Sequence, residues 1–347
     1  MVTDKIVSSP QGAPLLCGVD LGGTKIAIAL VERDGHVRAQ RQIRDHRNVP
    51  PREVVSSIAA TVRELLATEG ILLTDLPGIG VGTSGHVNYD RGIVITNSNL
   101  PGFKGFPLGD RLQGELGVPI YLDNDANAQA WAEYRFGAGQ GFPDMAFITA
   151  STGVGAGLIV HGTIFRGVTG TAGEMGHAIV EPTSSIICGC GRPGCLMAYT
   201  SGLTLPQVVR EMVACGPRLA GAAIFRDPSA DAAPSSIDFT ALQDREITGE
   251  LIGEGLRGGD PFCRQVVEQY ADYFAIGLNN LYQTINTAHF VVGGGLTGWG
   301  APYLDRIRER FRILVKDQAA SIPEIRLAQL GAEAAVVGAA ALPLEQR

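Results

Sequence analysis

Two short acidic segments framed by glycine contain the residue types with the clearest chemistry in this chain. The first, Asp20-Leu21-Gly22-Gly23-Thr24-Lys25, lies between the apolar runs 15–19 and 26–31, a pattern that predicts a hairpin turn between two strands. The exposed backbone N–H groups of such a turn, together with one carboxylate, are suited to a phosphate and its metal ion.

The second segment, Leu122-Asp123-Asn124-Asp125-Ala126-Asn127, follows the strand-like run 118–122 and precedes a helical segment at 126–136. A carboxylate at the end of a strand, where a helix begins, is well placed to accept a proton from a bound hydroxyl. The same residues could also serve as an ordinary helix cap, and the two roles are compatible. Together, the two acidic segments indicate phosphoryl transfer to an alcohol.

A third cluster has the composition of a metal site. Cys188, Cys190 and Cys195 lie close together, and His177 precedes them. Three thiols and one imidazole are enough for a closed tetrahedral Zn²⁺ site, which would be structural rather than catalytic. The intervening glycines suit tight turns around a metal, although a reduced, metal-free thiol cluster remains the alternative. The scattered cysteines are expected to be small buried residues without chemistry: Cys17, Cys215 and Cys263.

The length and composition restrict the class of protein. A chain of 347 residues exceeds what one hydrophobic core usually organises, so two domains with a ligand cleft between them are expected. The net charge of -7 gives no basic field for a nucleic acid partner. No apolar stretch approaches the ~20 residues of a membrane helix, and the N-terminus lacks the apolar core of a secretion signal. These features predict a soluble cytoplasmic protein without membrane or nucleic acid partners.

Alternating and helical hydrophobic patterns outline the elements of the first domain. Residues 15–43 predict an antiparallel meander of three strands with an Asp34-Gly35 turn, followed by a helix that stops at Gly70 and a strand at 78–83. The segment 141–164 repeats the opening pattern, with a strand at 145–150, a turn over Ser151–Gly157 and a return strand at 158–160.

The rest of the chain predicts a helix at 262–285, a strand at 289–292 and the loop Gly293-Gly294-Gly295. The Ala- and Pro-rich stretch 216–236 is expected to be an irregular or mobile insertion. An Ala-rich helix at 332–342 is expected to pack back on the first domain. The predicted domains are therefore 1–124 with 331–347, and 125–330.

Taken together, these motifs resemble the ROK family of sugar kinases and related repressors, a branch of the actin-like ATPases. The resemblance spans Asp20 to Gly338 and implies an α/β fold of two actin-like (ribonuclease H-like) domains. Each domain would have a mixed sheet flanked by helices, with nucleotide and sugar in the interdomain cleft, from which closure excludes water. It depends on five elements in the expected order: Asp20–Lys25, Leu122–Asn127, Ser151–Gly157, Ala172–His177 and Cys188–Cys195.

The resemblance also implies the residues that bind ATP and Mg²⁺. Glycine-rich turns provide backbone N–H donors without side chains that block a phosphate. Either turn taken singly could be only a tight structural hairpin. The residues implied at the phosphates are Asp20, Gly22, Gly23, Thr24, Lys25, Thr152 and Gly153, and those implied at the adenosine are Gly293, Gly294, Gly295 and Leu296.

On the acceptor side, the resemblance makes Asp125 the base that takes a proton from the primary hydroxyl of the sugar during attack on the γ-phosphate. Asn124 would hold a ring hydroxyl, and Gly85 with Asn99 would belong to the sugar-contacting loop. The family motif also assigns Glu174 and His177 to sugar hydroxyls, with His177 binding zinc as well.

One position departs from the family pattern. Relatives carry Leu-Glu after the third cysteine, whereas this chain has Leu196-Met197. A thioether cannot replace the charge-assisted hydrogen bond of a carboxylate, worth roughly 1.5–3 kcal/mol. Met197 therefore predicts an acceptor without that ordinary hydroxyl: an aminosugar, a modified hexose or a seven-carbon cyclitol. The alternative is that Met197 merely fills the pocket and weakens activity on ordinary hexoses.

Two other classes of function compete with a kinase. A sugar-sensing ROK repressor would need a helix-turn-helix domain before the first hairpin, and only about fifteen residues precede the first predicted strand. A catalytically inactive sugar-binding protein is disfavoured because Asp20, Asp125 and both glycine-rich turns are present. The resemblance also implies a homodimer. It leaves open the identity of the acceptor and whether polyphosphate can replace ATP.

Overall fold

The computed structural model describes residues 15–215, 224–225, 233–316 and 322–345. The chain divides into two compact units, residues 1–136 with 332–347, and residues 137–331. The first unit thus extends beyond the expected boundary at residue 124, because helix α3 (Asp125–Phe136) packs against α10 (Ala334–Ala341). Most of the expected insertion at 216–236 lies outside the described residues.

The first unit contains a five-stranded mixed sheet in the order β3-β2-β1-β4-β7. The predicted meander is confirmed, since β1, β2 and β3 pair antiparallel, whereas β4 and β7 extend the sheet in parallel with β1. Gly35 occupies the predicted turn with φ +91°. The strands are β1 (Leu16–Leu21), β2 (Lys25–Val31), β3 (Val37–Arg44), β4 (Ile79–Thr83) and β7 (Ile120–Asn124), with a separate hairpin of β5 (His86–Asn88) and β6 (Ile93–Thr96).

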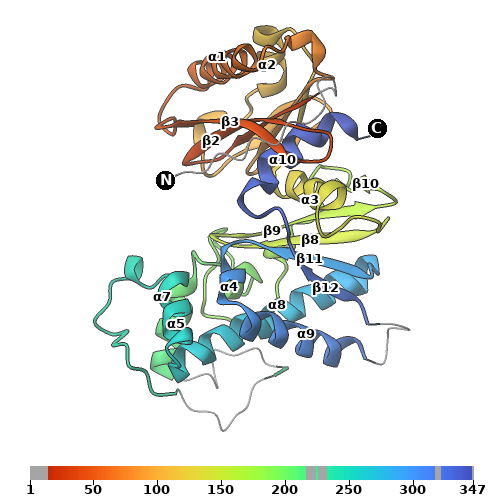
Figure 1. Cartoon of the computed structure of the whole chain (residues 1–347). Helices are drawn as coiled ribbons and strands as arrows, with labels where there is room; N and C mark the ends of the chain where they lie inside the picture. Colours follow the sequence, from red (N-terminus) through yellow and green to blue (C-terminus); the bar gives the residue numbers. More distant parts are fainter. Residues whose placement is uncertain (1–14, 216–223, 226–232, 317–321, 346–347) are drawn as a thin grey trace. The chain divides into compact units, whose positions relative to one another are not determined.

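Helices cover both faces of this sheet (Figure 1). On one face lie α1 (Pro51–Glu69) and α2 (Leu108–Leu116), and on the other lie α3 and α10. Helix α1 begins with proline in its first turn and ends at Gly70, which has the left-handed φ of +68° that stops a helix.

Small residues allow α10 to lie directly on the sheet. A Cβ added to Gly18 of β1 would come within 2.3 Å of the Val336 carbonyl oxygen, and one on Gly80 of β4 within 1.7 Å of the Ala339 carbonyl oxygen. A Cβ added to Gly338 would likewise come within 1.8 Å of the Ala128 carbonyl oxygen in α3. The C-terminal helix α10 therefore packs closely against the sheet and α3 of the first unit.

The second unit repeats the topology of the first, with strand order β10-β9-β8-β11-β12. The predicted turn Ser151–Gly157 is too long, because β9 already begins at Val154 and pairs with β8 from that residue. The side chains of Val154, Ala156 and Leu158 are buried at alternate positions, as expected for a strand. The glycines between them are therefore part of β9 and pair with β8. The strands are β8 (Met145–Ala150), β9 (Val154–Val160), β10 (Thr163–Ile164), β11 (His289–Gly293) and β12 (Glu324–Leu327).

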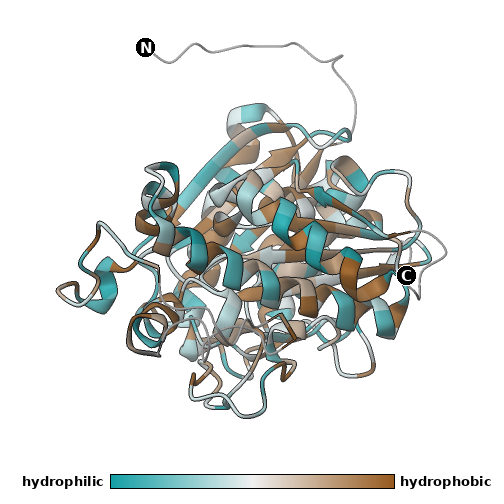
Figure 2. Ribbon diagram, turned by 90° about the horizontal axis from the view of Figure 1, so that it is seen from below, coloured by the Kyte–Doolittle hydropathy of each residue, from teal (hydrophilic) through white to brown (hydrophobic). Residues whose placement is uncertain are grey.

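The long helix α8 (Pro261–Ile285) is the main packing element of this unit. Its N-cap Asp260 accepts a 2.9 Å hydrogen bond from the N–H of Cys263, and it ends at Asn286 in the left-handed region. In Figure 2 the interior strands are mostly hydrophobic, whereas the outer helices alternate between hydrophilic and hydrophobic sides. Among the described residues, the other α-helices of this unit are α4 (Met197–Thr200), α5 (Leu205–Cys215), α7 (Gly249–Arg257) and α9 (Ala301–Val315).

Within the described part of the chain, no helix combines the length and apolar character needed to cross a membrane.

Candidate active site

The turn between β1 and β2 is short and tightly constrained. The Gly22 N–H donates to the carbonyl oxygen of Lys25 at 3.2 Å and closes the turn. A Cβ on Gly23 would lie 2.8 Å from the Cβ of Asn99, closer than real Cβ contacts. Glycine at position 23 is therefore required by the neighbouring loop that carries Asn99.

Asp20, the last polar residue of β1, has an unusual acidity. Its pKa is raised from 3.8 to about 6, first by burial and then by the negative charge of Asp125, while Lys25 opposes both effects. The two carboxylates thus lie close enough to interact. Such a pair is stabilised by a cation.

Asp125 is the first residue of α3, immediately after β7. The positive end of the helix dipole favours a negative charge there. The Ala126 N–H donates to both the Asp125 carboxylate, at 2.9 Å, and the Asn124 side-chain oxygen, at 2.8 Å. The buried Asp123 instead accepts hydrogen bonds from the Asn124 N–H and the Asn127 side chain, both at 2.8 Å, which is a structural role.

Asn124 connects this junction to the loop after β4, because its side-chain amide donates to the carbonyl oxygen of Gly85 at 2.9 Å. Gly85 has φ +85°, and an added Cβ would lie 2.1 Å from the Thr96 oxygen, so no other residue fits there. The first unit therefore brings together five of the predicted residues: Asp20, Gly85, Asn99, Asn124 and Asp125.

Asn97 organises the acceptor-side loop, a role that the sequence pattern did not predict. Its buried side-chain oxygen accepts hydrogen bonds from the N–H groups of Asn99 and Leu100, at 3.0 and 2.9 Å, and from the Ser84 hydroxyl at 3.1 Å. The exposed Asn99 side chain in turn donates to the Ser84 hydroxyl at 3.2 Å. The two asparagines shortly before Pro101 could have indicated this role. An asparagine side chain often accepts hydrogen bonds from the backbone of a turn that begins just after it, and here that turn contains the second asparagine.

In the second unit, the turn between β8 and β9 is held by the segment after α4. The Ser151 N–H donates to the Gly153 oxygen at 2.9 Å, and the Leu203 N–H donates to the Thr152 oxygen at 3.1 Å. Half-buried Met197 places its sulfur 3.5 Å from the position of a Cβ on Gly153. Position 197 therefore lies beside the turn that was predicted to bind phosphate.

The loop after β11 lies beside the same turn. Gly294 has φ +94°, and an added Cβ would lie 2.3 Å from the Ala150 oxygen at the end of β8. A Cβ on Gly295 would face the Ser151 hydroxyl at 3.7 Å, while Leu296 is buried. The structure thus brings together the predicted nucleotide-binding residues of this unit: Thr152, Gly153, Gly293, Gly294, Gly295 and Leu296.

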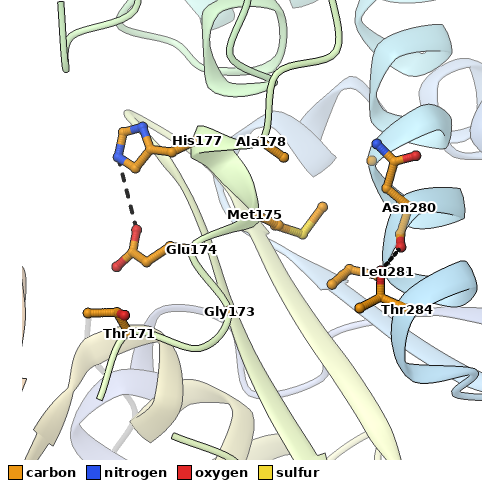
Figure 3. A pocket seen from close by; sticks show the side chains of 10 residues that line it. Thr171, Gly173, Glu174, Met175, His177, Ala178, Asn280, Leu281 and Thr284 are labelled. Carbon is orange, nitrogen blue, oxygen red and sulfur yellow. Dashed lines mark hydrogen bonds and ion pairs between the residues drawn. The ribbon is translucent and has the colours of Figure 1, made fainter. Parts of the chain in front are cut away.

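Glu174 and His177 lie at the short helix η3 (Met175–His177), with the Glu174 carboxylate 4.0 Å from the imidazole Nε2 (Figure 3). They line a pocket of about 440 Å³ whose opposite wall is formed by Asn280, Leu281 and Thr284 of α8. This arrangement leaves a carboxylate and an imidazole accessible to a polar ligand.

The predicted metal ligands converge in the structure. The ligand atoms of His177, Cys188, Cys190 and Cys195 all lie within 4.8 Å of one another. Two of these separations are 3.7 Å, from Cys188 Sγ to His177 Nδ1 and from Cys190 Sγ to Cys195 Sγ. Tetrahedral Zn²⁺ with bonds of ~2.3 Å to sulfur and ~2.0 Å to nitrogen requires separations of about 3.5–3.8 Å. The four groups therefore fit zinc.

The acidities of the three thiols differ. Burial raises the pKa of Cys195 to about 12 and also raises the pKa of Cys188, whereas hydrogen bonding with Arg192 lowers the pKa of the exposed Cys190 to about 6. Buried thiols of this kind become thiolates when a cation binds them. Gly194 in the same knuckle has φ +73°, and an added Cβ would lie 2.0 Å from the Glu181 oxygen.

A sequence profile of the ROK family matches residues 16–346, and the chain therefore belongs to the ROK family. Glucokinase of Streptomyces coelicolor is 32% identical over 95% of this chain and 98% of its own length. The solved structure of a ROK hexokinase from Thermus thermophilus is 29% identical, with a TM-score of 0.76 over 94% of this chain and 97% of that chain. A ROK family glucokinase from Streptomyces griseus, solved with glucose and AMPPNP, is 34% identical, with a TM-score of 0.73 over 94% and 98% of the two chains.

These similarities extend over nearly the whole chain. The predicted fold class, a mixed α/β actin-like fold, is therefore confirmed.

Proposed function

We propose that this chain is an ATP- and Mg²⁺-dependent kinase that phosphorylates the primary hydroxyl of a hexose or hexose-like ring. The observation that carries the proposal is the pair of interacting carboxylates, Asp20 at the end of β1 and Asp125 at the start of α3. Phosphoryl transfer to an alcohol needs one carboxylate near the attacking hydroxyl and one near the cation on the phosphates. The similarity to glucokinases along nearly the whole chain supports the same chemistry.

Asp125 would be the general base. Its place at the N-terminus of α3 favours the ionised form, which accepts the hydroxyl proton as the oxygen attacks the γ-phosphate. Asn124 and Asn99 would hold ring hydroxyls, and the hydrogen bonds of Asn124 to Gly85 and Ala126 keep its side chain in one orientation. This positioning supports catalysis because the reaction depends mainly on correct placement of the acceptor.

Asp20 would be the protein partner of Mg²⁺, a role supported by the burial and negative surroundings that raise its pKa. When bound, the cation supplies charge neutralisation on the phosphates of ATP. Lys25 would add a second positive charge, and the two short turns would bind phosphate through their N–H groups. The residues proposed at the phosphates are Gly22, Gly23, Thr24, Lys25, Thr152 and Gly153, and those proposed at the adenosine are Gly293, Gly294, Gly295 and Leu296.

His177, Cys188, Cys190 and Cys195 would bind a structural Zn²⁺. Four protein ligands leave no open position, so the metal would stabilise this loop rather than activate water. With Nδ1 facing the thiols, His177 turns Nε2 toward the Glu174 carboxylate, which lies 4.0 Å away, beyond hydrogen-bond distance. Nε2 therefore keeps its hydrogen-bonding capacity, and Glu174 and His177 would contact sugar hydroxyls.

Met197 would make the acceptor different from plain glucose. The thioether lies beside Gly153 and offers no strong hydrogen-bond acceptor to a hydroxyl. An aminosugar, a modified hexose or a seven-carbon cyclitol would fit this position better than an unmodified glucose. We also propose a homodimer on the basis of the family resemblance, which analytical ultracentrifugation tests.

The decisive experiment supplies the purified protein with Mg²⁺·ATP and a panel of glucose, N-acetylhexosamines and seven-carbon cyclitols. A phosphate ester detected by mass spectrometry, together with ADP, is the expected product. A parallel panel with polyphosphate determines the phosphoryl donor. Failure to form an ester with any acceptor and either donor would overturn the proposal.

A further inference from the structure

One buried histidine has no role in the function proposed above. His46 lies between β3 and α1 and is only 3% exposed, whereas Arg44, Asp45, Arg47 and Asn48 around it are all exposed. Asp45 has a left-handed φ of +59°, a conformation that aspartate tolerates better than most residues. The chain therefore turns sharply just before it buries a single polar side chain.

The buried imidazole contacts the turn between β1 and β2. His46 Nε2 lies 2.8 Å from the carbonyl oxygen of Gly22. Because a carbonyl oxygen can only accept, Nε2 carries the proton and donates. The other ring nitrogen, Nδ1, is buried and has no hydrogen-bond partner within the described residues. The polar contact of this buried ring is thus directed at the turn.

This contact determines the direction of one peptide group. A trans peptide is planar, and its C=O and N–H groups point to opposite sides. By holding the Gly22 oxygen toward the buried ring, His46 turns the Gly23 N–H away from the ring. A peptide between two glycines rotates easily, since neither residue has a Cβ to restrict it, so an external restraint has a large effect on its orientation.

We propose that His46 is a positioning residue that holds the Gly22–Gly23 peptide so that the Gly23 N–H is available to a nucleotide phosphate. This inference rests on the proposed kinase function. His46 does not touch the nucleotide itself, and it acts through the backbone of the turn. Its effect therefore falls on nucleotide affinity rather than on the affinity for the acceptor.

The test compares His46→Gln with His46→Asn. The glutamine amide nitrogen reaches about as far as Nε2 of histidine, whereas the asparagine amide is one methylene shorter and cannot reach Gly22. Binding of Mg²⁺·AMPPNP is measured by isothermal titration calorimetry, which needs no turnover. His46→Gln is expected to stay within about threefold of wild type, and His46→Asn to bind about tenfold more weakly, with the KM for the acceptor unchanged.

His36→Asn is the matched control, because this histidine is exposed on the Asp34-Gly35 turn of the same unit, and its variant is expected to bind as wild type. Unchanged nucleotide affinity in His46→Asn, or an equal loss in the Gln and Asn variants, would overturn the inference. If circular dichroism shows that His46→Asn does not fold, His46→Met replaces it, because methionine fills a similar volume without an N–H.

The two proposals can fail separately. A wild-type protein that binds Mg²⁺·AMPPNP but phosphorylates no acceptor contradicts the kinase function, while the affinities of the His46 variants still decide the role of this residue. A wild-type protein that binds no nucleotide contradicts both.

Discussion

Replacement of Asp20 by asparagine should stabilise the protein in the absence of metal, with a gain that begins near pH 4 and is complete above about pH 6. The folded-state pKa of about 6 is higher than the ordinary value of 3.8, so the folded state binds the proton more tightly than the unfolded state does. Stability therefore falls as pH rises from about 4 to about 6, and the loss persists at higher pH.

The size of this effect follows from the same difference in pKa. At 1.36 kcal/mol for each pKa unit, the difference between 3.8 and about 6 corresponds to a loss of at most about 3 kcal/mol in the free energy of unfolding. Because Asp20 keeps some contact with solvent, we expect about 1–2 kcal/mol, or a rise in Tm of a few degrees for the first unit. Asparagine has nearly the same shape, so the change isolates the charge.

Thermal unfolding with a metal chelator, followed near pH 8 and near pH 4.5, measures this effect. Asp20→Asn should exceed wild type in Tm by clearly more near pH 8 than near pH 4.5, whereas Mg²⁺·ATP should stabilise wild type more than the variant. Asp90→Asn, an exposed position in the same unit, is the control. A variant that is no more stable than wild type near pH 8, or equally stabilised at both pH values, would refute the inference that burial and the charge of Asp125 destabilise the ionised Asp20.

Four other substitutions test the remaining parts of the site. Asp125→Asn should lower kcat by about 10²–10⁴-fold and leave acceptor affinity within a factor of about two, because a general base is lost without a change of shape; a wild-type rate in steady-state kinetics would exclude this role. Cys190→Ser should lower the zinc content measured by plasma mass spectrometry and reduce Tm, since three ligands hold the metal less well than four. An unchanged metal content would contradict the zinc site. Met197→Glu should raise kcat/KM for glucose relative to the native acceptor by about tenfold or more, through one charge-assisted hydrogen bond. An unchanged ratio would show that position 197 does not set specificity. Gly23→Ala should raise the KM for both ATP and the acceptor, because the added methyl group displaces Asn99. An effect on ATP alone would argue against that contact.

Local patterns in the sequence were enough to predict much of the fold. The alternating strands of the opening meander, the helix that ends at Gly70 and the repeat of the same pattern near Ser151 all depend on hydrophobic spacing and on turn residues close together in the chain. The convergence of the candidate metal ligands was predictable for the same reason, since three of the four are cysteines within one short segment. The order of these motifs also indicated the family, which the profile match confirmed.

Boundaries were less predictable where backbone pairing and packing decide them. The turn expected at Ser151–Gly157 ends at Gly153, because alternate residues from Val154 onward enter the core. Helix α3 belongs to the first unit, against the expected boundary at 124, because it packs on a helix about two hundred residues later in the sequence. Sequence spacing contains no information about such a partner.

The sequence by itself therefore determined which residue types were available for the chemistry and in which local elements they lie. Only the tertiary structure decided their surroundings: the carboxylate pair of Asp20 and Asp125, the contact of Gly23 with Asn99, and the hydrogen bond from His46 to Gly22. Each of these contacts joins residues that are distant in the chain. Burial, charge repulsion and steric exclusion arise from neighbours in space, and the folded chain alone sets those neighbours.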